Sequence, residues 1–204
     1  MATILAWQQS QRVTGGHLEH DVKTSQLILQ RTEKAVLQKV EHLCHPTRVD
    51  YSSLGEALPR DELHCALQMY SAIYQGQLGR SQVVVNTEWY PESIFGAVQE
   101  TLIYSKIEGH NIGPRFLAHI TENQHRVYEY MLESLPARRA TIYDLAICKA
   151  VLAKLHALKI IYGSLSSLSF LIVDNRAFLH CFGGSLLTHE QSLFDKEMAS
   201  VEKF

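Results

Sequence analysis

The sequence predicts a mixed α+β fold in which helices and strand pairs alternate along the chain. Residues 92–108 and 141–158 carry apolar side chains at the spacing of one helix face. Residues 72–85 and 170–182 each carry two short apolar or β-branched runs separated by turn-forming residues, as in β-hairpins. Helices interleaved with antiparallel hairpins are typical of the α+β class.

The composition is that of a globular protein with a substantial core. The chain has 204 residues, of which 46% are hydrophobic and 20% charged, which suits one domain or a compact two-lobed one. Its net charge of -2 gives no basic excess for nucleic acid or for an anionic membrane. No apolar run approaches the length of a membrane span, and residues 1–9 lack the basic start of a signal peptide. We therefore expect a cytoplasmic or nuclear protein whose four cysteines are reduced.

The sequence of the N-terminal third predicts a tail, one helix and a segment that leads into the elements expected from about residue 70 onward. Residues 1–23 have little periodicity, and Thr24 or Ser25 is a suitable cap for a helix over about 25–44. Turn formers dominate residues 47–60, and residues 61–70 fit either a short helix or an irregular strand. The apolar face of the expected helix consists of Leu29, Val36, Val40 and Leu43.

The hairpin predicted next has strands at 72–75 and 82–85, and Pro91 then opens the helix over 92–108. Strands are expected at 116–121 and 126–131 because apolar and polar residues alternate there.

The C-terminal part begins with the longest predicted helix, over 141–158. A second hairpin follows, with strands at 170–173 and 177–182 around a turn at 174–176. The last predicted helix covers about 189–203.

A signature stretch runs from Leu155 to Gly183. It reads L-H-A-L-K-I-I-Y-G-S-L, then S-F-L-I-V-D, then C-F-G. This stretch resembles the core of protein-kinase-like families, which carry L-H-x-x-x-I-x-H-G-D-L-x-x-x-N followed by D-F-G. The apolar positions and the glycines coincide, and the resemblance is closest to small, degenerate members such as those of fungi.

The resemblance implies a two-lobed kinase-like fold over residues 70–204, after an N-terminal part at 1–69. The small lobe would cover about 70–132 and a reduced large lobe about 133–204, with the 25–44 helix as an addition.

The resemblance also assigns the positions of the catalytic residues. Asn86 stands at the phosphate-binding Lys, and Glu100 stands at the helix Glu that pairs with it. Tyr162 stands at the His before the glycine, and Ser164 at the base Asp. The two metal-binding positions, Asn and the Asp of D-F-G, are Ser169 and Cys181.

These substitutions predict that the chain does not catalyse phosphoryl transfer. Ser164 is a poor proton acceptor at neutral pH, and losing one general base costs roughly 10²–10⁴ in rate. Hydroxyl and thiol groups replace the oxygen ligands that Mg²⁺ prefers, and Asn86 carries no charge for a phosphate. We therefore expect a pseudokinase with no cofactor and no metal, acting as a protein-binding or regulatory module.

Two alternatives remain open at this point. One is a nucleotide-dependent phosphotransferase with a rewired site that uses Asp174 or Glu100. The other is an unrelated α+β interaction domain, because fold and function are separable. Metal-ligating residue types also occur in the N-terminal third, but without the paired spacing of a zinc site, so ordinary structural roles are favoured. They are His42, Cys44, His45, His64 and Cys65.

Overall fold

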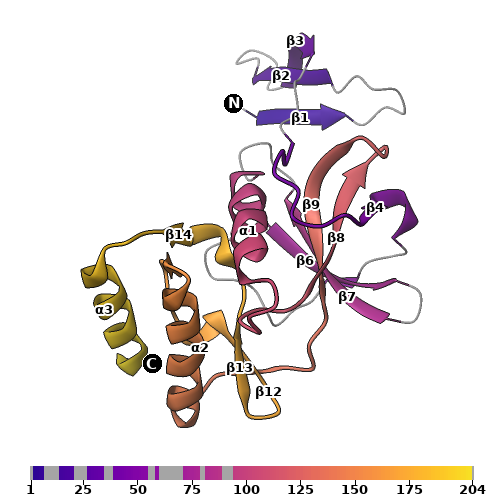
Figure 1. The fold of residues 1–204 in the computed structure, drawn as a ribbon. Coiled ribbons are helices and arrows are strands. Elements are labelled where there is room, and N and C mark those ends of the chain that lie inside the picture. Colours follow the sequence, from indigo (N-terminus) through magenta and orange to yellow (C-terminus); the bar gives the residue numbers. More distant parts are fainter. Residues whose placement is uncertain are drawn as a thin grey trace. The chain divides into compact units, whose positions relative to one another are not determined.

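The computed structural model of the chain contains two compact units, Met1–Gln38 and Lys39–Phe204 (Figure 1). The described residues are 2–6, 14–20, 27–34, 39–54, 58–59, 71–78, 81–88 and 94–203.

The N-terminal unit is a three-stranded antiparallel sheet. Its strands are β1 (Ala2–Ala6), β2 (Thr14–His20) and β3 (Leu27–Lys34), in the spatial order β1-β2-β3. The β2–β3 register shifts between His17 and Leu18, where one strand bulges.

The predicted helix over 25–44 is wrong. Strand β3 occupies its first half, and residues 39–47 contain no helix. The physical reason is that these backbone groups bond to other strands. β3 pairs with β2, and the Val40 N–H donates to the Val127 carbonyl at 2.8 Å. Such pairing outweighs the small free-energy differences of intrinsic helix propensity.

The second unit contains a six-stranded sheet in the order β4-β8-β9-β7-β6-β5. β4 runs parallel to β8, and every other neighbouring pair is antiparallel. The strands are β4 (Arg48–Asp50), β5 (Leu58–Pro59), β6 (Ser71–Leu78), β7 (Ser81–Glu88), β8 (Phe116–Glu122) and β9 (Arg126–Glu133).

Both hairpins predicted within this sheet are confirmed. β6 and β7 pair from Ser71↔Glu88 to Leu78↔Ser81, so the strands are longer than the alternating pattern suggested. β8 and β9 pair around a turn at residues 123–125. The sheet also includes β4 and β5, which precede the expected domain start at residue 70, while residues 60–70 lie outside the described residues.

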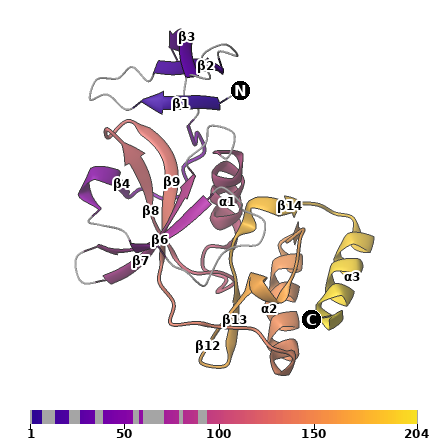
Figure 2. The same ribbon diagram turned by 180° about the vertical axis from the view of Figure 1, so that it is seen from behind.

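Three helices form at the predicted places. They are α1 (Ile94–Ile107), α2 (Leu145–Ala157) and α3 (Gln191–Ser200). A 3-10 turn, Ile142–Asp144, leads into α2, and another, Val201–Lys203, follows α3. α2 and α3 lie side by side in both views (Figures 1 and 2). Of the helices in the described part of the chain, none combines the length and apolar character needed to cross a bilayer.

Short strands surround these helices. β12 (Phe170–Val173) and β13 (Arg176–Leu179) form the predicted second hairpin, and β10 (Arg138–Arg139) extends it. The expected second strand at 177–182 is too long, because Cys181 has a left-handed backbone (φ 59°) that ends the extended run. β11 (Ile160–Ile161) pairs with β14 (Leu186–Leu187), a ladder that the sequence did not predict.

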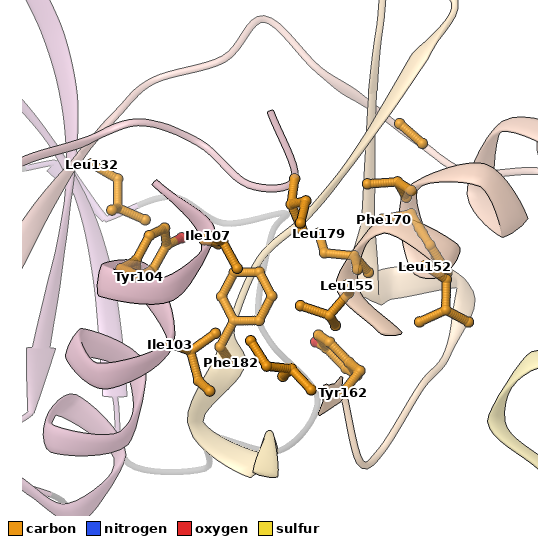
Figure 3. Packing of buried hydrophobic residues seen from close by; sticks show 14 of the residues in the cluster. Ile103, Tyr104, Ile107, Leu132, Leu152, Leu155, Tyr162, Phe170, Leu179 and Phe182 are labelled. Atoms are coloured by element: carbon orange, nitrogen blue, oxygen red, sulfur yellow. The ribbon is translucent and has the colours of Figure 1, made fainter. Parts of the chain in front are cut away.

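Phe182 lies at the centre of the largest buried cluster (Figure 3). Its ring is fully buried and makes an edge contact with the Tyr104 ring of α1 at 5.3 Å between centroids. Leu155 of α2 and Tyr162 lie on the other side of the ring (Figure 3). Burying a side chain of this size contributes about 1.5–3 kcal/mol, so Phe182 is a main link between α1 and α2.

Candidate functional site

The signature region forms one closed segment, which we call the central segment, from Tyr162 to Ser185. The β11–β14 ladder pairs Ile160 with Leu187 and Ile161 with Leu186 just outside its two ends. At the ends themselves, the Ser185 hydroxyl donates to the Tyr162 carbonyl at 3.0 Å. The first and last residues of the central segment therefore lie next to each other.

A buried carboxylate, Glu197 of α3, holds the start of the central segment. Its Oε2 accepts from the Tyr162 N–H at 3.0 Å and lies 2.7 Å from His156 Nε2. Its Oε1 accepts from the Gly163 N–H at 2.7 Å. Burial raises the pKa of this carboxyl group, but the hydrogen bonds from His156, Tyr162 and Gly163 outweigh it and lower the pKa overall. Glu197 is therefore an ionised anchor for the turn at neutral pH.

Gly163 is the residue that lets the chain turn there. Its φ is +101°, and a Cβ at this position would fall well inside van der Waals contact with the Gly184 carbonyl oxygen. A side chain is thus excluded both by the backbone conformation and by the returning chain.

The two serines of the signature have different surroundings. Ser164 is exposed to solvent. Ser169 is buried, and its Oγ accepts from the Ser166 N–H at 3.0 Å. The Ser166 Oγ in turn accepts from the Leu168 N–H at 3.2 Å, so the two hydroxyls cap the 3-10 turn Ser167–Ser169 reciprocally. Ser169 therefore has a structural role in the turn.

His180 connects three of the predicted site residues. Its carbonyl accepts from the Tyr162 hydroxyl at 2.8 Å, and its N–H donates to the Ser169 carbonyl at 3.4 Å. Its Nδ1 lies 3.0 Å from the Cys181 Sγ. The structure thus brings Tyr162, Ser169 and Cys181 together around His180, while Ser164 stays apart from this group.

Glu100 of α1 is fully buried against aromatic residues. Tyr130 makes a side-chain hydrogen bond to it, and Tyr104 interacts with it electrostatically. Burial raises the pKa of both tyrosines well above its usual value, and the charge of Glu100 raises both further. The Tyr104 and Tyr130 rings also contact each other, with centroids 5.9 Å apart. Tyrosine rings therefore occupy the space beside the Glu100 carboxyl group.

Asn86 is placed only through its backbone. It lies on β7 and pairs with Ile73 of β6 and Tyr130 of β9. Its side chain lies outside the described residues.

Sequence reasoning missed His180 and Glu197. For Glu197 a signal exists in the sequence, because the apolar residues Phe194 and Val201 lie at helical spacing and place position 197 on the same face. A carboxylate on the buried face of a helix is rare unless it has partners. For His180, the position directly before the C-F-G triplet carried no recognisable pattern.

The metal-ligating residue types of the N-terminal third form a different arrangement. The N–H groups of Cys44 and His45 donate to His119 Nε2 at 3.1 and 3.3 Å. His119 is fully buried, and burial together with the positive charges of His45, Arg48 and His42 lowers its pKa to about 4. In the described part of the chain, no three side chains form a group that could hold a metal ion. His64 and Cys65 lie outside it.

Comparison with models of known protein families and with curated proteins finds no match to this chain.

Proposed function

We propose that the chain is a catalytically inactive domain of the protein-kinase-like type that serves as a protein-binding or regulatory module. The order of its elements supports this proposal. The elements follow one another in the order that the resemblance implies. The β6–β7 hairpin comes first, followed by helix α1, the β8–β9 hairpin, the long helix α2, and the β12–β13 hairpin that leads to Cys181-Phe182-Gly183.

The observation that carries the proposal is the position of Glu100. In an active kinase-like site, the matching carboxylate holds a lysine against the phosphates of the nucleotide. Here Glu100 is fully buried, and its hydrogen-bond partner is the Tyr130 side chain. A tyrosine hydroxyl that is neutral at physiological pH supplies no charge to bind a phosphate.

The remaining positions add to this argument. The Ser169 hydroxyl caps its own turn, and the Cys181 thiol contacts His180. Neither group is a carboxylate or carbonyl oxygen of the kind that Mg²⁺ prefers. Glu100 and Asp174 are the carboxylates that a rewired phosphotransferase would use. They differ in environment, since Glu100 is buried and Asp174 is exposed in the β12–β13 turn.

A thermal-shift titration of the full chain with ATP, with and without Mg²⁺, tests the absence of nucleotide chemistry. A ligand at a hundred times its Kd would stabilise the fold by about 2.7 kcal/mol, which moves the melting temperature by several degrees. We expect no shift at millimolar ATP beyond that given by inorganic triphosphate, the control for ionic effects. A shift that requires both ATP and Mg²⁺ would support the phosphotransferase and overturn the proposal.

The binding function is tested separately by affinity capture with the full chain from cytosolic and nuclear extracts. We expect a partner protein that stays bound through high-salt washes, in an amount close to one molecule per molecule of the immobilised chain. If each such protein is also retained by the heat-denatured chain, the binding module is rejected.

A further inference from the structure

We infer that Cys181 and His180 form a reactive thiol site, at which the Cys181 sulfur exchanges with a small disulfide of the glutathione type. This inference does not depend on the proposed function. It depends on the arrangement of three groups: a thiol, an imidazole and a backbone carbonyl.

The imidazole of His180 is oriented as a base toward the thiol. Its Nε2 lies 2.9 Å from the Leu168 carbonyl oxygen. A carbonyl only accepts hydrogen bonds, so Nε2 carries a proton, and in the neutral ring Nδ1 is left as the acceptor. The Cys181 Sγ lies 3.0 Å from this Nδ1. A nucleophile, a base and a group that orients the base are the parts of an activated nucleophile.

The geometry of the chain fixes this contact. His180 is buried and held by the hydrogen bonds of its backbone N–H and carbonyl to Ser169 and Tyr162. Cys181 has a left-handed backbone at the N-terminal end of the 3-10 turn Phe182–Gly184. The adjacent Phe182 is locked in the core, so neither neighbour of the thiol is free to move away.

Two other cysteines provide an internal contrast. Burial raises the pKa of the Cys44 and Cys148 thiols to about 11. Neither has an imidazole within 3.5 Å of its sulfur among the described contacts; the shortest such distance is 3.8 Å, from Cys44 to His119. Cys148 is fully buried, whereas Cys181 is partly exposed. Because the thiolate is the reacting form, Cys181 is the described cysteine best placed to react near neutral pH.

Other ionisable groups near the thiol act against its deprotonation. Tyr104 of α1 and Tyr130 of β9 both interact electrostatically with Cys181, and both lie close to Glu100. A negative charge on Glu100 disfavours a thiolate nearby. The proton acceptor at His180 is therefore what the reaction requires.

The proposed step is thiol–disulfide exchange. His180 Nδ1 takes the proton of the Cys181 thiol, and the thiolate attacks one sulfur of glutathione disulfide. A bond forms between Cys181 Sγ and that sulfur, and the S–S bond of glutathione disulfide breaks. The leaving glutathione thiolate receives the proton from His180. Cys181 is oxidised to a mixed disulfide and one glutathione is reduced, so atoms and electrons balance.

The experiment is time-resolved peptide mapping of the reduced full chain after addition of glutathione disulfide at pH 7. We expect Cys181 to be modified at least about tenfold faster than Cys148. The variant His180→Gln keeps an N–H that can donate to the Leu168 carbonyl but has no basic nitrogen, and it should slow Cys181 by about tenfold. The matched control Cys148→Ala should leave the Cys181 rate unchanged.

A second measurement needs no variant. Iodoacetamide alkylation of the folded wild-type chain across pH 6–9 should give a rate for Cys181 that levels off at lower pH than the rate for Cys148. Equal rates for the two cysteines, or the same pH dependence for both, would overturn the inference. An unchanged Cys181 rate in a folded His180→Gln variant would also overturn it.

Discussion

Gly163 sets the direction of the chain at the start of the central segment, and its two constraints can be separated by experiment. Gly109 also has a positive φ, +77°, but a Cβ built there meets nothing within 4 Å. We expect Gly109→Ala to cost about 1 kcal/mol in unfolding free energy, the cost of the backbone conformation alone. Gly163→Ala adds a clash with the Gly184 carbonyl and should cost roughly 2–4 kcal/mol.

Urea unfolding of the two variants measures this difference. Equal losses for Gly109→Ala and Gly163→Ala would mean that the close approach of Gly184 does not constrain the turn.

Single residues were predictable where a local pattern carried them. Glu100 was expected on a helix because the apolar spacing of 92–108 placed it there, and α1 confirms that position. The left-handed backbone of Cys181 was not predictable, because most residues that adopt it are Gly, Asn or Asp. The contact between Glu197 and Gly163 was out of reach because it joins residues far apart in the chain.

At the scale of elements, Glu197 joins α3 to the central segment by two hydrogen bonds. Glu197→Ala leaves the buried N–H of Tyr162 and the N–H of the more exposed Gly163 without their acceptor. Leaving a buried donor unsatisfied costs about 1–3 kcal/mol, and the loss of the second hydrogen bond adds to it. We therefore expect a loss of roughly 2–5 kcal/mol in unfolding free energy. Amide exchange at Tyr162 and Gly163 should accelerate in the same variant.

Glu202→Ala is the matched control for this prediction. Glu202 pairs with Lys149 on the surface, just beyond the end of α3. Exposed pairs of this kind contribute little, so the loss should be much smaller. Losses of similar size in Glu197→Ala and Glu202→Ala would contradict the anchoring role of Glu197.

The success of sequence prediction differed between elements for a physical reason. α1, α2 and the β8–β9 hairpin form where the apolar pattern matches one period over several turns or residues. The prediction of a helix at 25–44 was wrong because apolar residues are sparse there and the backbone groups form hydrogen bonds with other strands. The β11–β14 ladder is too short for any periodic signal to exist.

For the whole second unit, acid sensitivity should depend on His119. Its pKa is lowered from 6.5 to about 4, so between these values the unfolded chain binds a proton that the folded chain does not. Stability must therefore fall as the pH decreases from about 6.5 towards 4, by up to about 1.4 kcal/mol per pH unit. Urea unfolding at several pH values across this window measures the slope.

His119→Gln tests the assignment. Glutamine offers an oxygen near the position of Nε2 for the Cys44 and His45 N–H groups but does not titrate. The difference in stability between wild type and variant should shrink as the pH decreases. Parallel curves would show that the acid sensitivity arises elsewhere, for example at Glu197, whose pKa is also lowered.

The α+β class was predictable for the molecule as a whole, because helix and hairpin patterns alternate along most of the chain. The N-terminal three-stranded sheet was not, since Gly15 and Gly16 interrupt its middle strand and weaken the β signal. The predicted kinase-like relationship and its function stay predictions, to be decided by the ATP titration and by affinity capture.

The β11–β14 ladder has a consequence for how this protein tolerates mutation. The ladder and the Ser185–Tyr162 hydrogen bond hold the two ends of the central segment together. These interactions offset the entropy cost of closing the chain between them, so its interior residues are not needed for closure. An exposed side chain inside it, such as that of Ser164, can then change identity without altering where α2 ends and α3 begins. The ladder therefore separates the exposed positions between its two strands, where substitutions are tolerated, from the surrounding helices and sheet, whose arrangement stays the same.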